Sequence, residues 1–219
     1  MSTLPPGLRD RVLAEAAKAP KAAPGTFSRR VVSTVLVVTL WMGVTTWVMG
    51  IRPDLHDLPL VYSIGTFAAL VLGAGTMSRL GVARGRSMLG PPVWVLMSMA
   101  IALPLVVSLW SYVVPSPVPT SLGCGTQAQA MSFAPKCALI TLALATPVLG
   151  AMLWLRRGMI AASPALTGAC LGAAAATWAH LVQHAHCPVA NPMHVLMGHA
   201  LPIVPVMIIS AIVGRKVFR

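Results

Sequence analysis

The chain has 219 residues, of which 57% are hydrophobic and only 9% are charged, and its mean hydropathy is +0.80. A soluble domain of this size could not tolerate that composition without a very large exposed apolar surface, so the sequence predicts a polytopic membrane protein. The net charge of +12 would suit a nucleic-acid-binding protein, but the basic residues lie in short clusters at the ends of apolar runs. We therefore expect no direct binding of nucleic acid.

Residues 1–30 precede the first apolar run and predict a short amphipathic helix. Pro5 and Pro6 suit the first turn of a helix, and an apolar face follows at i, i+4 and i+8, formed by Leu8, Val12 and Ala16. A helix of about 13 residues is marginal alone in water, so it would be firm only when docked on a partner. A solvated tail in front of the first span is the alternative.

The predicted domains are this partner-binding segment, 1–30, and a transmembrane domain, 31–219.

Six apolar segments are long enough to cross the membrane as helices, since roughly 20 residues span about 30 Å of hydrocarbon. The fold class is therefore all-α, with spans expected near 31–50, 58–77, 92–114, 135–157, 162–182 and 193–213. The fifth span contains a GxxxG pattern at Gly168 and Gly172, which lets two helices pack closely. Packing within one chain is the favoured interpretation, and a homodimer seam stays open.

The distribution of lysine and arginine predicts the orientation of these spans. Of the 16 basic residues, 14 fall in the termini and in loops on one side, and the other side receives only Arg52 and Lys136. By the positive-inside rule both termini are cytoplasmic, which gives an N-in/C-in topology with a cytoplasmic N-terminal helix.

The connection between the fifth and sixth spans is rich in histidine and is expected at the outer face. His180 and His184 are four residues apart, so on a helix they share one face. Imidazole and thiolate ligands suit zinc and copper, so an alternative function is a membrane redox protein that binds Zn, Cu or haem. The ligands would come from His180, His184, His186, His194 and His199. The plainer alternative is that some of these rings only form hydrogen bonds inside the bundle.

Three cysteines, Cys124, Cys137 and Cys187, are expected on the outer side, where they allow three pairings and leave one thiol over. A bond between Cys137 and Cys187 would act either as a structural staple or as a redox-sensing bridge. We expect exposed thiols whose pKa is lowered by nearby histidines, which would favour oxidation. Cys170 lies in mid-span and is expected to be a small core residue.

The sequence lacks the residues of the common catalytic sites. None of its four acidic residues falls inside a span, which disfavours a proton-coupled transporter. It has no phosphate-cradling glycine loop, nucleophile elbow or HExxH helix. We therefore expect no enzymatic activity and, outside the metal or haem alternative, no cofactor.

The second half of the chain resembles the NrsF-like family of six-span bacterial anti-sigma factors. The resemblance rests on motifs in a fixed order: Cys137-Ala-Leu, Leu155-Arg156-Arg157-Gly158, Ala165-Leu-Thr-Gly168-Ala with Gly172, His186-Cys187-Pro188, and Gly214-Arg215-Lys216. Two features depart from the family pattern. Residues 189–192 replace a stretch that is often acidic and aromatic, and the hairpin is unusually rich in histidine.

This resemblance implies a multi-pass protein of the bacterial inner membrane whose partners are the lipid bilayer and an extracytoplasmic-function sigma factor. The N-terminal segment would hold the sigma factor and release it on an envelope, redox or light-derived signal. The expected contact residues are Leu8, Arg9, Arg11, Val12, Leu13, Glu15 and Ala16. Cys137 and Cys187, with Cys124 as a competing partner, are the expected sensor or staple.

Overall fold

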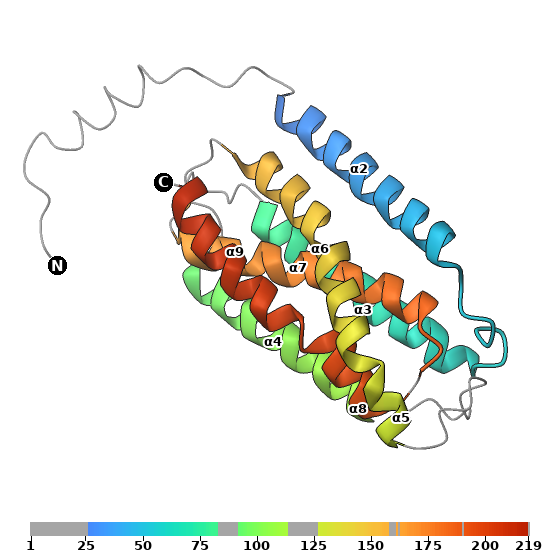
Figure 1. The fold of residues 1–219 in the computed structure, drawn as a ribbon. Helices are drawn as coiled ribbons and strands as arrows, with labels where there is room; N and C mark the ends of the chain where they lie inside the picture. The colour runs from blue at the N-terminus through green and yellow to red at the C-terminus, as the bar shows by residue number, and fades with distance from the viewer. Residues whose placement is uncertain are drawn as a thin grey trace, which may run out of the picture. The chain divides into compact units, whose positions relative to one another are not determined.

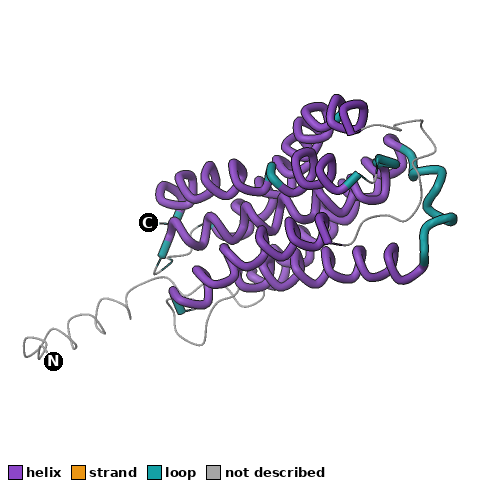
Figure 2. Tube along the Cα trace, turned by 90° about the horizontal axis from the view of Figure 1, so that it is seen from below, coloured by secondary structure: helices purple, strands orange, loops and turns teal. Residues whose placement is uncertain are grey.

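The computed structural model describes residues 26–82, 92–113, 127–157, 161, 163–189 and 191–218, and all regular structure in these ranges is helical (Figure 2). The chain divides into two compact units, Met1–Ser33 and Thr34–Arg219. In the first unit the structure describes only the start of the first membrane helix. The predicted amphipathic helix and Cys124 lie outside the described residues, so both stay predictions.

Six helical segments of the described chain are long and apolar enough to cross a membrane, which confirms the predicted number of spans. Four are single helices. The fourth segment, Ala128–Arg156, and the sixth, Pro192–Val217, are each built from more than one helix. The elements are α2 (Thr26–Met49), α3 (Leu60–Val82), α4 (Val93–Val113), α5 (Gln127–Ser132), α6 (Ala134–Arg156), α7 (Pro164–His186), α8 (Pro192–Val195), the π-helical turn η1 (Leu196–Ala200) and α9 (Ile203–Val217). The orientation of the spans in the membrane remains a prediction.

Four spans differ from the sequence prediction. Helix α2 begins at Thr26 and α3 ends at Val82, each five residues beyond the predicted bounds of 31 and 77. The fifth helix continues to His186 instead of ending near residue 182, because no helix breaker precedes Pro188 and the Cys187 N–H still donates to the Gln183 carbonyl. The sixth span is not one continuous helix. Its first turn is capped by the Asn191 side chain, and η1 and a turn then separate α8 from α9.

Helix α7 is the central helix of the second unit (Figure 1). It contacts α3, α4, α6 and α9, and 78% of its membrane segment is buried, against 6% for the first span. The run Ala173–Ala176 is fully buried. Alanine side chains keep α7 thin, so its neighbours approach closely on several sides.

Three glycines, which we call the glycine seam, join α7 to α9: Gly168, Gly172 and Gly214. A Cβ atom at Gly168 would run into the carbonyl group of Ser210, and one at Gly172 would meet the Ser210 side chain and the Val206 carbonyl. These contacts confirm that the GxxxG pattern packs within the chain.

The outer surface of the bundle suits a hydrocarbon solvent. Large apolar side chains such as Trp47, Leu60 and Trp94 are more than two-thirds exposed, at 83%, 73% and 71%. The buried hydroxyl of Thr45 donates to the Trp41 carbonyl one turn earlier, at 2.8 Å. A hydroxyl satisfied by its own helix leaves no free donor toward lipid, which agrees with a transmembrane position.

Candidate functional site

Four buried side chains meet where α6 begins, α7 ends and the composite sixth span begins. We call this group, Cys137, Cys187, His194 and His199, the thiol–imidazole centre. One sulfur or ring nitrogen from each residue lies within 4.8 Å of the others. The exposed fraction is 8% or less for each of the four residues. The structure thus brings the two predicted sensor cysteines together with two of the five predicted histidine ligands.

The two thiols are adjacent but not bonded. Their Sγ atoms are 3.9 Å apart, whereas a disulfide bond is about 2.05 Å long. On the other side, Cys187 Sγ lies 3.4 Å from His194 Nε2. A proton leaving Cys187 therefore has an imidazole nitrogen within reach.

Backbone carbonyl groups and polar side chains hold the centre in place. His194 Nδ1 lies 2.8 Å from the Ala130 carbonyl oxygen of α5. If Nδ1 carries the proton and donates it there, Nε2 is left as the acceptor that faces Cys187. Gln183 Nε2 donates to the Cys137 carbonyl at 2.9 Å, and the Thr141 hydroxyl reaches the Gly198 carbonyl at 3.2 Å. Helices α5, α6 and α7 and the turn η1 all contribute to this support.

A row of histidine rings extends from the centre along α7. The His199 ring lies 5.2 Å from the His194 ring and 5.5 Å from the His180 ring, measured between ring centroids. Within the described part of the chain, His180 Nδ1 and His199 Nε2 are buried without a hydrogen-bond partner. Buried polar atoms are usually paired, so unpaired ones point to a strained, catalytic or ligand-binding role.

Cys137 and Cys187 do not lie on an exposed surface, which corrects the expectation of exposed thiols for these two residues. The expected lowering of the pKa is also wrong for Cys187. Its hydrogen bond with the Cys137 thiol, together with burial, raises the pKa of the Cys187 thiol. If Cys187 loses its proton on oxidation, His194 Nε2, at 3.4 Å from its Sγ, is a nearby acceptor.

The remaining histidines lie apart from the centre, so the predicted five-histidine ligand set is divided. The His184 ring packs against the Tyr62 and Phe67 rings, with centroids 5.7 and 5.3 Å away. His186 Nδ1 lies 2.9 Å from the Gly50 carbonyl oxygen. Cys170 is fully buried with its thiol 3.4 Å from the Leu96 carbonyl oxygen, which confirms it as a core residue.

The donor set of the centre fits a zinc or copper ion. Two thiols and two imidazoles are among the ligand sets that these metals prefer. The unpaired Nε2 of His199 is available as a ligand, and the contact of His194 Nδ1 with a backbone carbonyl is the usual support for a metal-binding imidazole. Sequence reasoning considered imidazole and thiolate ligands for the histidine-rich hairpin, but it treated Cys137 only as a disulfide partner. The expected pairing of Cys137 with Cys187 was the signal that could have added Cys137 to that ligand set, because it already brings the start of the fourth span to the hairpin.

A buried ion pair fastens the loop after α2 to the end of α7. Arg52 forms two hydrogen bonds with Asp54, at 2.7 and 2.8 Å, and donates a third to the Pro188 carbonyl at 3.2 Å. The Arg52 N–H also donates to the Ala185 carbonyl at 2.9 Å. The Arg52 guanidinium holds the pKa of the Asp54 carboxyl below its usual range. This tether, which the sequence did not predict, fixes the segment that carries Cys187.

The amino-acid sequence matches one known protein family. The family model described as a negative regulator of sigma F matches residues 13–219, which include all six spans and the whole thiol–imidazole centre. Comparisons with curated proteins and with solved structures give no match. Because the family match covers nearly the whole chain, the protein belongs to the NrsF family of negative regulators of sigma F.

Proposed function

We propose that this protein is an anti-sigma factor of the bacterial inner membrane that sequesters an extracytoplasmic-function sigma factor and releases it on a signal received by the thiol–imidazole centre. The family match over residues 13–219 carries this proposal, because it includes part of the N-terminal segment and the entire predicted membrane domain. The family is regulatory and not enzymatic. Both termini would lie in the cytoplasm, as the distribution of basic residues predicts.

The N-terminal segment, 1–30, is the proposed contact for the sigma factor. An amphipathic helix can bind by laying its apolar face in a groove on the partner. Leu13, Glu15 and Ala16 fall inside the family match, whereas the four remaining contact candidates precede it. The +12 charge of the chain does not require a nucleic acid partner, since the membrane orientation accounts for it.

Release requires two states of the membrane domain that differ in their affinity for the sigma factor. Oxidation of the two thiols is the proposed switch. Hydrogen peroxide would take two electrons and two protons from Cys137 and Cys187, giving one disulfide and two water molecules. The sulfur atoms would have to move from 3.9 Å to about 2.05 Å apart. That movement pulls α6 toward the segment after α7 and so acts on the central helix.

The sigma contact is tested by affinity purification from native membranes followed by mass spectrometry. The tagged full-length protein should recover a sigma factor, and a chain lacking residues 1–30 should not. Leu8→Asp combined with Val12→Asp should abolish recovery without harming membrane insertion, and Ala14→Asp on the opposite face is the matched control. Recovery of a sigma factor by the truncated chain would contradict the proposed contact.

The switch is tested separately, with the sigma factor already bound. Cys137→Ala and Cys187→Ala should retain the sigma factor after peroxide treatment that releases it from the wild type. Cys170→Ala is the matched control, because this thiol lies apart from the centre against Leu96, and it should release normally. Release from both centre variants would show that the thiols are not the switch.

A second candidate for the signal is a thiophilic metal ion, which the four donor atoms within 4.8 Å specifically favour. Detergent-purified protein should then bind one zinc or copper ion per chain, and His199→Leu should lose it. Elemental analysis measures this directly. A Soret band in the absorption spectrum would instead support the haem-binding alternative. If neither metal nor haem is bound, thiol oxidation remains the proposed signal.

A further inference from the structure

A cavity between α3 and α4 lies beside the histidine row and is distinct from the thiol–imidazole centre. Its volume is about 290 Å³, near the lower end of the roughly 300–1,000 Å³ of small-molecule pockets. Helix α7 contributes His180 and His184 to its wall. A cavity of this size holds one substituted ring, but not a macrocycle such as haem.

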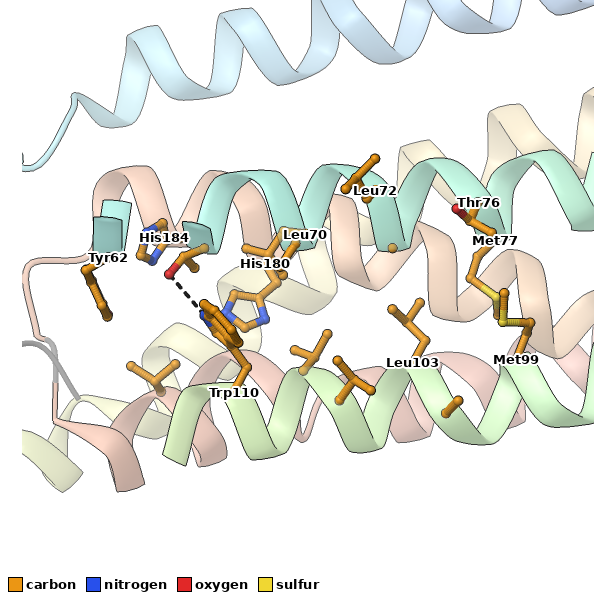
Figure 3. A pocket seen from close by; sticks show the side chains of 17 residues that line it. Tyr62, Leu70, Leu72, Thr76, Met77, Met99, Leu103, Trp110, His180 and His184 are labelled. Carbon is orange, nitrogen blue, oxygen red and sulfur yellow. Dashed lines mark hydrogen bonds between the residues drawn. The ribbon is translucent and has the colours of Figure 1, made fainter. Parts of the chain in front are cut away.

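The cavity has a polar end and an apolar end (Figure 3). Tyr62, Trp110 and the two histidines lie at one end, and methionine and leucine side chains lie toward the other: Met77, Met99 and Leu103. This distribution fits an amphiphile whose compact head sits among the aromatic rings. A hydrocarbon tail would then follow the apolar wall.

Two unpaired ring nitrogens belong to the polar end. The exposed fractions of His180 and His184 are 2% and 6%. His180 Nδ1 and His184 Nε2 have no hydrogen-bond partner among the described residues. A neutral imidazole carries one N–H donor, so a ligand with carbonyl oxygens could satisfy these rings. Trp110 does not compete for this role, because its N–H already donates to the Thr66 hydroxyl at 3.1 Å.

The charge of the lining selects the class of head group. None of the 17 residues that line the cavity is an aspartate, glutamate, lysine or arginine. A carboxylate or phosphate head would be desolvated there without a counter-charge, which is costly. A flat, uncharged ring with carbonyl acceptors loses little solvation and can pack against the Tyr62 and Trp110 rings.

We propose that this cavity binds a lipid-soluble quinone, with the head group between His180, His184 and Trp110 and the tail along the apolar wall of α3 and α4. The site does not depend on the proposed function. It would nevertheless place a ligand against His180, whose ring lies 5.5 Å from His199 of the thiol–imidazole centre.

Equilibrium dialysis of the detergent-purified full-length protein against a decyl-tailed benzoquinone tests the proposal. We expect saturable binding of about one molecule per chain. Ala69→Trp, which fills the cavity, should weaken binding at least tenfold, whereas Ala68→Trp on the exposed side of the same helix should not change it. His180→Leu, which leaves the cavity open, should weaken binding about tenfold through the loss of a hydrogen bond.

Two further probes identify what the cavity recognises. Decylbenzene, which has the tail without carbonyl groups, and dodecanoate, which has a charged head, should each bind at least tenfold more weakly than the quinone. Equal binding of decylbenzene would reduce the site to a hydrocarbon groove, and equal binding of dodecanoate would indicate an anion site. Either result, the absence of saturable quinone binding, or equal binding by the wild type and His180→Leu would overturn the proposal.

Discussion

The two ends of α7 differ in what surrounds them: close backbone packing at the N-terminal end and buried polar side chains at the C-terminal end. At its N-terminal end the glycine seam presses backbone against backbone on α9, and the Ser210 hydroxyl is satisfied by the Met207 carbonyl at 3.1 Å. At its C-terminal end the helix is surrounded by polar groups, and four described side chains hold a buried atom without a partner: His180, Gln183, His184 and His199. One end therefore maximises packing, while the other retains costly polar groups.

We assign the two ends of α7 different roles: the glycine seam stabilises the bundle, and the polar end undergoes the proposed change on signal reception. Close helix contact gains van der Waals energy, which drives association inside a membrane where the hydrophobic effect is absent. Unpaired polar atoms cost free energy and persist where another requirement keeps them. We infer that the seam anchors α7 in the bundle, so that a chemical change at the other end moves neighbouring segments without dissociating the helix.

The largest effect is expected at the seam. Gly168→Leu should destabilise the protein by about 3 kcal/mol, because its side chain meets the backbone of α9, which cannot rotate away. Unfolding in mixed micelles measures the change. Gly150→Leu is the matched control, since nothing lies within 4 Å of that position. Equal stability of the two variants would contradict the anchoring role of the seam.

A smaller loss is expected at the loop tether. Asp54→Asn should cost about 2 kcal/mol at neutral pH, because Arg52 then remains buried without its charged partner. Because the pKa of Asp54 is lowered in the folded protein, the pair contributes fully above the ordinary aspartate pKa of about 3.9. The difference from the wild type should vanish as the pH falls through the lowered value. Exposed Asp57→Asn should show neither effect, and a gap that persists at low pH would contradict the ion pair.

Replacing a polar ring in the centre should have the opposite sign. His199→Leu should raise stability by about 1 kcal/mol, because an apolar side chain removes an unpaired buried nitrogen. Thermal unfolding of the purified protein, with Met197→Leu on the exposed side of η1 as control, tests this. A loss of stability on this replacement would mean that the ring serves as a structural support.

The smallest effect is expected at His186. His186→Ala removes the contact with the Gly50 carbonyl and should cost about 0.5 kcal/mol. Amide hydrogen exchange of the loop after α2 should become faster, and the same measurement on exposed His56→Ala should show no change. If exchange is unaltered, Arg52 alone fastens the loop.

Hydropathy predicted the six spans because the length of an apolar run limits a membrane helix directly. The same measure cannot distinguish a lipid-facing side from a buried one, since both are apolar. The sequence therefore did not predict that α7 is central or that Cys137 and Cys187 are buried. His184 and His186 are separated from the centre because α7 continues past residue 182 and carries both side chains on the helix. The end of a helix is the part of a sequence-based prediction that is least well determined.

The π-helical turn η1 sets the rotational phase of the last span. His194 and Ser210 are 16 positions apart (210 − 194), which at about 100° per residue would place them about 160° apart around a regular helix. One extra residue in a π turn reduces this angle to about 60°, so both side chains can face α7. The Leu201 N–H, which donates to the Leu196 carbonyl at 2.8 Å, marks the insertion. A single added residue thus allows the sixth span to contact α7 in two places. His194 lies beside Cys187 after the C-terminal end of α7, and Ser210 packs against Gly168 and Gly172 in its N-terminal half.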